Sequence, residues 1–450
     1  MRRIAIIGGG AAGAGAAWEL HKSLGGEARI SLFERAEHVG GRAWDLTFAG
    51  CHMEVGGVLF HSTGQITKQM MEFTGAREAV PSLSIDGKKE TYAFWTKAGF
   101  PVLTRVSLAS MALGILKHVG VPSALKVTRR AIKMAERYEG VYQRLRERAA
   151  FATPDELFGE LGLLEPTKIS AAEYFKRLGV NDRMAYDVVE AITHNMYNQG
   201  LEMNALACLV GLAGAGLAGG HLFVIDGGNW TLFDKMLRKA GVELRVNRPV
   251  RRVVATSAAD AAGRPFSYQV QTADGRSDDF DAVILAAPPA LADLAVEVDG
   301  RALPVVAHPY QKVVTTLVVG ELNPAYFGRS PGRPMPSTIF TASSAPAPFK
   351  SIGTTGWSPE FDSRIYKIFS ADHHMTEAEL AAIFAKIHDT RVHTWPGAYP
   401  VLTPGLEHLP FELNPGLYFA NALETIAGSI EVEAVSGANA AKACARYLKG

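Results

Sequence analysis

The first 34 residues constrain the fold of this chain more than any other stretch. Residues 3–7 form a short apolar run that predicts a strand, and residues 11–24 are rich in Ala and Leu, which favours a helix. Residues 28–33 predict a second strand. The turn before the helix contains three glycines with the spacing G-x-G-x-x-G: Gly8, Gly10 and Gly13. This order of elements is typical of a Rossmann-type dinucleotide-binding unit.

Glu34 supports the same interpretation. It follows the predicted second strand directly and stands about 20 residues after the last motif glycine, where a carboxylate accepts hydrogen bonds from the ribose of an adenine dinucleotide. Glycines let the backbone approach the pyrophosphate, and the helix N-terminus stabilises its charge. The alternative is that Glu34 is a solvated acid at a strand end, but this alternative does not explain its spacing from the glycines and the predicted helix.

A second G-x-G-x-x-G pattern occurs within residues 214–219. The residues before it are helical in composition, and residues 221–226 after it predict a strand instead of a helix. We therefore interpret these glycines as small residues that allow close packing of a helix. The sequence predicts one dinucleotide site, not two.

The segment after Glu34 distinguishes between dinucleotides. Gly40 and Gly41 are followed by Arg42, and this element resembles the G-G-R turn of flavin amine-oxidase-like enzymes, where it wraps the far side of the FAD pyrophosphate. An arginine there offers charge-assisted hydrogen bonds. The hydroxyl residue that those enzymes place a few positions later is absent from the run Ala43-Trp44-Asp45. We count Arg35 among the candidate FAD-binding residues as well.

The charge balance and the cysteines exclude several classes of protein. The formal net charge is +1 at pH 7, so nothing in the composition calls for nucleic acid. The three cysteines lie far apart without a C-x-x-C pair, which predicts neither a disulfide framework nor a zinc site. Such thiols suit a reducing compartment, so we expect a cytoplasmic protein that holds no metal. The richness in Ala, Gly and Arg favours a bacterial source.

Two apolar segments raise the question of membrane contact. The longer, residues 205–220, falls short of the roughly 20 residues that span a bilayer, and predicts a buried helix. The other, residues 106–116, precedes a basic amphipathic pattern over residues 117–148. Two interpretations stay open for residues 106–148: peripheral docking on an anionic membrane, and a solvated helix face over a core helix.

The remaining residues predict a second domain. Residues 85–100 alternate like a hairpin with Asp86-Gly87 at its corner, and residues 102–150 and 168–200 predict helices. Residues 310–370 are dominated by strand signals. We predict an α/β protein, a Rossmann-type FAD-binding domain with a second α+β substrate domain, in the two-domain layout of amine oxidases. The predicted boundaries are 1–80, 220–300 and 405–450 for the FAD-binding domain, and 81–219 and 301–404 for the substrate-binding domain.

The whole pattern resembles the prenylcysteine oxidase family of the flavin amine oxidase superfamily. The stretches that carry the resemblance are YQKVVTTLVVGELN (310–323), KIFS (367–370), AYP (398–400), the spacing of Tyr197, Gln199 and Asn204-Ala205, and ETIAGSIEVEAVSGANAA (424–441). The resemblance implies FAD, dioxygen and a lipophilic thioether such as farnesylcysteine. Hydride would leave the carbon bonded to sulfur for flavin N5, giving a prenyl aldehyde, cysteine and hydrogen peroxide. Such a step needs a positioned C–H bond and an apolar pocket instead of a strong base.

The resemblance also assigns residues to the site. It places Lys312 near flavin N5 and Tyr399 at the flavin face as candidate catalytic residues, against the alternatives of a plain strand-end lysine and a packing tyrosine. The candidate substrate residues are His194, Tyr197 and Trp395. The candidate FAD-binding residues beyond the motifs above are Gly57, Val58, Val250, Ala286, Asn421, Glu424, Ile430 and Glu431. For His194 the alternative is a capping or core role.

Three functions are therefore compared. The first is a flavin thioether oxidase, and the second is a flavin amine oxidase or a desaturase acting on another hydrophobic substrate. The third is a lipid-binding protein that keeps its flavin without turnover. Release of peroxide with farnesylcysteine, with amines or with neither separates the three.

Overall fold

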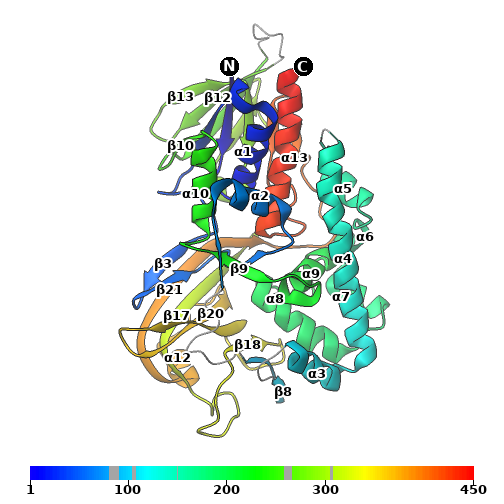
Figure 1. Ribbon diagram of the computed structural model, residues 1–450, viewed down its shortest axis with the longest axis vertical. Helices are drawn as coiled ribbons and strands as arrows, with labels where there is room; N and C mark the ends of the chain where they lie inside the picture. Colours follow the sequence, from blue (N-terminus) through cyan, green and yellow to red (C-terminus); the bar gives the residue numbers. More distant parts are fainter. Residues whose placement is uncertain (81–90, 104–107, 149, 258–265, 305–307) are drawn as a thin grey trace.

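The computed structural model describes residues 1–80, 91–103, 108–148, 150–257, 266–304 and 308–450. Figure 1 shows two regions along the long axis of the molecule. The amino and carboxyl termini lie side by side in one region, and the other consists of a large sheet with a group of helices beside it.

A six-stranded sheet lies in the region of the termini. Its central strand β1 pairs in parallel with β2 and β14, with Ile4 opposite Ile30 and Ala282. The last four residues of β1 are all buried, as expected for a parallel sheet covered on both faces. In spatial order the strands are β10 (Glu243–Arg245), β2 (Ala28–Phe33), β1 (Arg2–Ile7), β14 (Ala282–Leu285), β23 (Leu417–Phe419) and β22 (Glu412–Asn414).

Helices α1 (Ala11–Leu24) and α13 (Ile430–Lys449) pack on this sheet and against each other (Figure 1). Their contact is unusually close: a Cβ atom on Gly437 would lie 1.9 Å from the carbonyl oxygen of Ala12, and one on Gly15 would lie 2.3 Å from that of Ala434. The small residues of both helices thus bring the first and last helices of the domain together. Helices α2 (Gln65–Thr74) and α10 (Trp230–Lys239) also pack in this region.

Three smaller sheets flank the first. The five-stranded sheet has the order β13 (Ser277–Phe280), β12 (Ser267–Thr272), β11 (Val250–Thr256), β15 (Ala295–Val298) and β16 (Arg301–Ala302). The others are the pair β3 (Asp45–Phe48) and β4 (Cys51–Glu54), and the set β5 (Phe60–His61), β9 (Leu222–Ile225) and β6 (Glu78–Ala79). The β3–β4 pair leads directly into the loop predicted to lie beneath a flavin ring.

The seven-stranded sheet of the other region is mostly antiparallel. Its longest strands, β17 and β21, pair with each other, and their register shifts between Gln311 and Val313. The order is β21 (Phe384–Pro400), β17 (Tyr310–Leu322), β20 (Ser363–Ala371), β19 (Ser351–Ser358), β18 (Thr338–Thr341), β7 (Tyr92–Thr96) and β8 (Gly99–Leu103).

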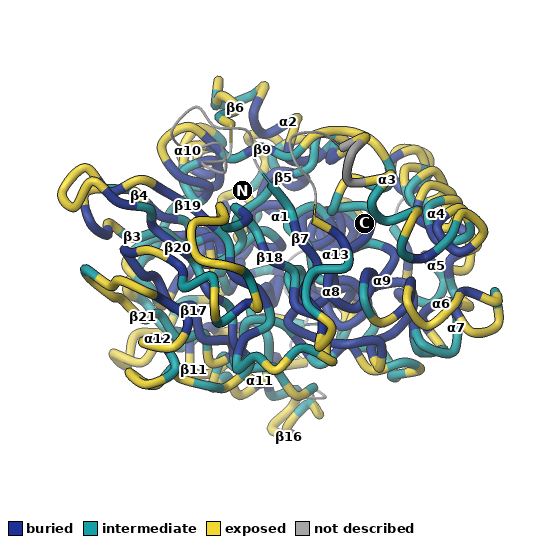
Figure 2. Tube along the Cα trace, turned by 90° about the horizontal axis from the view of Figure 1, so that it is seen from below, coloured by how far each residue is buried: buried dark blue, intermediate teal, exposed yellow. Residues whose placement is uncertain are grey.

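Helices pack beside this sheet, and Figure 2 shows exposed residues along the outer face of α4. The group consists of α3 (Leu108–Val119), α4 (Val121–Glu147), α5 (Pro154–Glu160), α6 (Glu165–Lys168), α7 (Ala171–Arg177), η2 (Arg183–Val189), α8 (Glu190–Tyr197), α9 (Ala205–Leu212) and η3 (Ala213–Leu217). Short helices elsewhere are η1 (Gly25–Glu27), α11 (Pro289–Ala292) and α12 (Glu377–Ile383).

The predicted α/β fold class is confirmed, with local corrections. The predicted hairpin forms between β7 and β8, so its corner lies at residues 97–98, whereas Asp86-Gly87 lies outside the described residues. The second glycine motif ends a helix and is followed by strand β9, as expected. The close packing predicted for its glycines is not found at Gly216 and Gly219, which have positive φ and open space where a Cβ atom would lie. Strand β19 and most of β21 were not predicted. The domain boundaries stay a prediction.

Candidate cofactor and substrate site

The first glycine turn has the geometry of a phosphate-binding loop. Gly8 has φ +111°, and a Cβ atom on it would lie 2.5 Å from the carbonyl oxygen of Ala286. A Cβ atom on Gly13 would lie 2.0 Å from the carbonyl oxygen of Gly8. Both positions therefore exclude a side chain. The Glu34 carboxylate accepts a hydrogen bond from the Gly9 N–H at 2.8 Å, which fixes this acid at the turn.

The second glycine turn lies against the first. The Gly40 N–H donates to the carbonyl oxygen of Gly9 at 2.8 Å. Gly41 has φ +59°, and a Cβ atom on it would lie 3.0 Å from Cα of Gly10. Two turns that are separated in sequence thus expose adjacent backbone, which is the arrangement that the FAD prediction requires.

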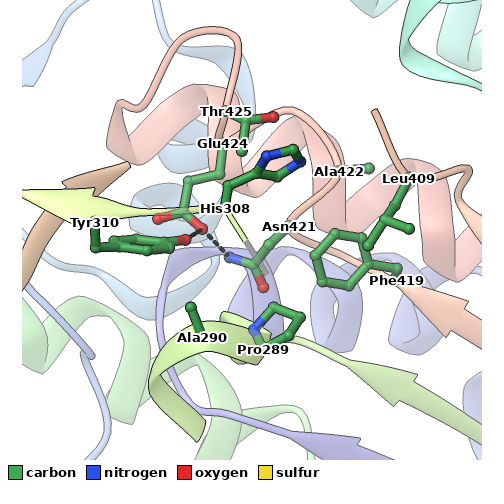
Figure 3. A pocket seen from close by; sticks show the side chains of 10 residues that line it. All are labelled: Pro289, Ala290, His308, Tyr310, Leu409, Phe419, Asn421, Ala422, Glu424 and Thr425. Carbon is green, nitrogen blue, oxygen red and sulfur yellow. Dashed lines mark hydrogen bonds between the residues drawn. The ribbon is translucent and has the colours of Figure 1, made fainter. Parts of the chain in front are cut away.

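A buried polar cluster forms next to Arg42. Its guanidinium pairs with Glu424, which also accepts hydrogen bonds from the Tyr310 hydroxyl at 2.8 Å and from the Asn421 amide at 3.2 Å. The same amide donates to Glu433 at 3.0 Å. Glu424 is 1% exposed, so the fold has placed a carboxylate in the interior and matched it with an arginine. Figure 3 shows Tyr310, Asn421 and Glu424 lining one pocket.

The electrostatics of this cluster favour one net charge state. Burial works against the charge of Arg42, but Glu424, Tyr310 and Glu433 outweigh it and raise the pKa of the guanidinium. Burial, and then the charge of Glu424, raise the pKa of Glu433 well above its usual value. The arginine is therefore charged and Glu433 is favoured in its neutral form. One oxygen of Asn421 and one of Glu433 are buried without a hydrogen-bond partner among the described residues.

The loop at Gly57 and Val58 joins this cluster. The Gly57 N–H donates to the carbonyl oxygen of Arg42 at 2.6 Å. The indole N–H of Trp395 donates to the carbonyl oxygen of Val55 at 2.9 Å, so the predicted aromatic residue holds the start of the loop. A Cβ atom on Gly57 would lie 3.5 Å from Ile430, the first residue of α13. The structure thus brings together Gly57, Arg42, Ile430 and Trp395, and their contacts with a cofactor or substrate stay predictions.

Two predicted tyrosines meet at the end of β21. The rings of Tyr197 and Tyr399 lie edge to face, with centroids 5.3 Å apart and an interplanar angle of 78°. Tyr197 is 3% exposed, and burial raises the pKa of Tyr399. Tyr399 also lies close to Gly428, just before α13. Two of the predicted site residues therefore pack against each other just before the start of α13.

Lys312 does not join the cluster. Its ammonium forms an ion pair with Asp372 at 2.7 Å, and both side chains are exposed. This ion pair occupies the amine at the start of β17, and a contact of Lys312 with the flavin stays a prediction. Another lysine of this sheet, Lys367 on β20, is partly buried, and its amine donates to the carbonyl oxygen of Glu54 at 3.1 Å. Burial lowers the pKa of Lys367 to about 8.

His194 has a structural environment, which corrects its prediction as a substrate residue. It is 1% exposed, and its Nδ1 lies 2.8 Å from the carbonyl oxygen of Thr341, so Nδ1 carries the hydrogen. Its Nε2 lies 3.2 Å from the Lys350 amine, which donates to it. Burial, and then the charge of Lys350, lower the pKa of His194 to about 4.

Glu431 and Arg35 also point elsewhere. The Glu431 carboxylate accepts hydrogen bonds from the N–H groups of Ile66 and Thr67 at the start of α2, and from the hydroxyl of Tyr142. It ties three helices together, which corrects its assignment to the cofactor. The Arg35 guanidinium donates to the carbonyl oxygen of Leu291 at 2.8 Å, on the surface.

Val250 and Ala286 lie in the dinucleotide region as the topology requires. Val250 is 5% exposed and begins β11, and the Ala286 N–H donates to the carbonyl oxygen of Ile7 at 2.8 Å, directly over the first glycine turn. Their predicted contacts with the cofactor stay proposals.

Sequence reasoning missed Glu433, Tyr310 and Asn229. Glu433 lies two positions after Glu431 on α13, so the two side chains point to nearly opposite sides of the helix. The helical period alone could therefore have shown that they contact different parts of the molecule. Tyr310 precedes Lys312 by two residues, and no feature of the sequence distinguishes their environments. Asn229 follows two glycines before α10, which reads as an ordinary helix start.

A group of donor atoms at β3 and β4 bears on the prediction that no metal is held. Carboxylate and imidazole atoms of Asp45, His52 and Glu54 lie within 4.8 Å of one another. An imidazole nitrogen of His52 lies 2.9 Å from the Asp45 carboxylate, and the Lys367 amine donates to the backbone carbonyl oxygen of Glu54, so both residues already have partners within the chain. The prediction of no metal stays a prediction.

The residues present fit FAD. Two turns that exclude side chains lie edge to edge, a carboxylate is fixed at the end of β2, and unpartnered oxygens of Asn421 and Glu433 lie beside Arg42. Backbone N–H groups of such turns and an arginine are the donors that a pyrophosphate needs.

Solved structures define the class of fold. Cyclohexylamine oxidase from Brevibacterium oxydans superposes with a TM-score of 0.65 at 13% identity, covering 100% of both chains. Wild-type putrescine oxidase bound to putrescine gives a TM-score of 0.63 at 16% identity, covering 98% of both chains. The chain therefore has the two-domain fold of the amine oxidases.

Sequence comparisons define the family within that class. The family model described as prenylcysteine lyase matches residues 113–449, and an NAD(P)-binding Rossmann-like domain matches residues 6–74. This chain belongs to the prenylcysteine lyase family, which confirms the resemblance. Farnesylcysteine lyase of Arabidopsis thaliana is 28% identical over 98% of this chain and 87% of the relative. Prenylcysteine oxidase 1 of Homo sapiens is 25% identical over 98% of this chain and 88% of the relative.

Proposed function

We propose that the protein is an FAD-dependent oxidase that cleaves a prenylated thioether such as farnesylcysteine. The observation that carries this proposal is the buried cluster of Arg42, Glu424 and Asn421 beside two glycine turns, in a chain of the prenylcysteine lyase family. Relatives named farnesylcysteine lyase and prenylcysteine oxidase, aligned over nearly the whole chain, support the substrate class.

The proposed cofactor contacts follow the length of a dinucleotide. Glu34 and Val250 lie at the adenosine end, the two glycine turns and Arg42 hold the pyrophosphate, and Asn421 and Glu424 face the chain that links it to the ring. Gly57, Val58 and Ile430 lie at the ring itself. Arg42 keeps its charge because Glu424, Tyr310 and Glu433 together outweigh the effect of burial, so its guanidinium, although paired with Glu424, can donate charge-assisted hydrogen bonds to a phosphate.

The protein supplies position and an apolar surface for the reaction. When bound, FAD would supply the redox chemistry: it would accept a hydride from the carbon next to sulfur and pass the two electrons on to dioxygen, which is released as hydrogen peroxide. With one water the products are a prenyl aldehyde and cysteine, and atoms and electrons balance. The rings of Tyr197, Tyr399 and Trp395 offer an apolar surface to the prenyl chain. Because aromatic rings also attract ammonium groups, amines are included in the test below.

Peroxide release tests the proposal directly. The holoprotein is mixed with farnesylcysteine, with putrescine and with cyclohexylamine in air, and peroxide and aldehyde are measured. We expect both products with farnesylcysteine alone. Release of peroxide with the amines only would contradict thioether oxidation and would indicate an amine oxidase. Bound FAD without peroxide from any substrate would favour a lipid-binding protein.

We also propose peripheral contact with an anionic membrane through α3 and α4. The structure describes no helix that combines the length and the apolar character needed to cross a bilayer. Exposed apolar side chains gather on the two helices: Leu113 and Val121 are each 53% exposed, and Leu125 and Ile132 follow on the same stripe of α4. Lysines and arginines flank them, which complements anionic headgroups.

Vesicle flotation distinguishes docking from a solvated helix face. We expect the wild type to float with vesicles of equal parts phosphatidylglycerol and phosphatidylcholine, and not with phosphatidylcholine alone. The double variant Leu113→Ser/Leu125→Ser should lose flotation, whereas Ile387→Ser, which removes an exposed apolar side chain on β21, should keep it. Equal flotation of all three proteins would contradict docking. We also propose a cytoplasmic location, which the three free cysteines support, and a bacterial source, which the richness in Ala, Gly and Arg favours.

A further inference from the structure

Asn229 is a buried residue that contacts the Gly57–Val58 loop and that the proposed function does not use. Its side chain is 0% exposed. Its amide donates two hydrogen bonds, to the carbonyl oxygen of Gly57 at 2.9 Å and to that of Val58 at 2.8 Å. Its amide oxygen accepts the Ile225 N–H at 2.9 Å, so all of these contacts fix one orientation of the side chain. One residue therefore holds both carbonyl groups of the loop.

The backbone of Asn229 extends the network to the large sheet. Its N–H donates to the Glu54 carboxylate at 2.7 Å, and the carbonyl oxygen of Glu54 accepts from the Lys367 amine. Burial raises the pKa of Glu54 to about 7, against the effect of the Asn229 N–H. The two ends of the loop are thus tied to α10 and to β20, which belong to different regions of the molecule.

The neighbouring residue Trp230 reaches the other cofactor turn. A Cβ atom on Gly40 would lie 2.6 Å from Cβ of Trp230, so the turn rests directly on the start of α10. The indole ring stacks on His38 with centroids 4.2 Å apart, and His38 stacks on Trp44 at 4.0 Å. The first turn of α10 therefore contacts both the pyrophosphate turn and the ring loop.

We propose that Asn229 is a positioning residue for FAD: its amide sets the Gly57–Val58 loop at a fixed distance from the Gly40–Gly41 turn. A loop that is fixed before the cofactor binds loses little conformational entropy on binding. This inference rests on the proposed function, because it takes FAD to be the group between the two turns.

The test compares Asn229→Asp and Asn229→Ser with Thr231→Val. Thr231 lies in the same turn of α10, and its hydroxyl donates only to the carbonyl oxygen of Gly228. FAD affinity is measured by quenching of flavin fluorescence, the flavin environment by visible circular dichroism, and folding by far-ultraviolet circular dichroism of the apoprotein. We expect both Asn229 variants to weaken FAD binding at least about tenfold, which corresponds to about 1.4 kcal/mol, and to alter the visible spectrum. Thr231→Val should behave as the wild type.

Hydrogen exchange of the wild-type apoprotein covers the case in which the variants do not fold. The amides of Gly57 and Asn229 are both hydrogen-bonded within the network, and we expect them to exchange more slowly than that of Gly26 on the surface. Exchange as fast as at Gly26, or a folded Asn229→Asp protein with FAD affinity within twofold of the wild type, would overturn the positioning role. A wild type that binds no FAD would overturn the proposed function and this inference together.

Discussion

Arg42 and Glu424 show how strongly a buried pair depends on both partners. Removing the arginine leaves a carboxylate that is 1% exposed next to Glu433, without its main source of positive charge. We expect Arg42→Met to lower the free energy of unfolding of the apoprotein by about 3 kcal/mol. The double variant Arg42→Met/Glu424→Gln should recover most of that loss. Urea denaturation of the two single variants and the double variant measures the coupling, and a double variant as unstable as Arg42→Met would contradict it.

The burial of His194 leads to a prediction of how the free energy of unfolding depends on pH. Its pKa is lowered from about 6.5 in the unfolded chain to about 4 in the fold, because burial disfavours its charged form. The unfolded chain therefore binds the extra proton between these values, so stability is lost as the pH falls from about 6.5 to about 4. We expect this residue to account for about 3 kcal/mol of that loss. His194→Gln should flatten the dependence in denaturation curves recorded from pH 4 to 7.5; an unchanged slope would mean that His194 is not buried as a neutral group.

At the residue scale, sequence motifs predicted the backbone of the site better than its side chains. Gly8, Gly13 and Gly41 were predictable because their backbone conformations or close contacts exclude side chains. The contacts of Lys312 and Glu431 in the structure differ from the predicted ones, because a single charged residue on a strand or helix gives no sign of the face it occupies. Asn229 was missed because its contacts join segments that are remote in sequence.

At the scale of secondary-structure elements, the dinucleotide region depends on the close packing of helix α1 against helix α13. Gly437 lies against the backbone of Ala12, and no side chain there can turn away to relieve the overlap. We expect Gly437→Ala to lower the free energy of unfolding by at least about 3 kcal/mol. Gly26→Ala has open space around it and should be neutral. Thermal or urea denaturation compares the two, and equal stability would show that the helices are not packed this closely.

The helices and strands were predicted correctly where a single spacing of apolar residues dominated the sequence. Strand β1 and helices α1, α2 and α13 follow from apolar runs and small residues. Strand β21 did not, because residues 385–391 are mostly exposed and polar, and the strand exists through its pairing with β17. The corner of the β7–β8 hairpin lies at Lys97-Ala98. The pairing of the two strands determines this position, and the turn preference of Asp86-Gly87 does not.

At the scale of the whole molecule, the family and the amine-oxidase fold follow from the order of motifs along the chain. The FAD-binding strands come from three separate parts of the sequence, and the order of β1, β14 and β23 in the sheet explains why both ends of the chain contribute. The substrate side follows less directly, because a pair of packed rings such as Tyr197 and Tyr399 has the same composition as any core.

The central claim is that this chain binds FAD and uses it to oxidise a prenylated thioether. Anaerobic mixing of the holoprotein with farnesylcysteine, followed at the visible absorption band of the flavin, tests it most directly. We expect the yellow colour to bleach within one turnover and to return when air is admitted, with one peroxide released for each thioether consumed. A protein that takes up no FAD, or whose flavin stays oxidised with farnesylcysteine while an amine bleaches it, would contradict the account.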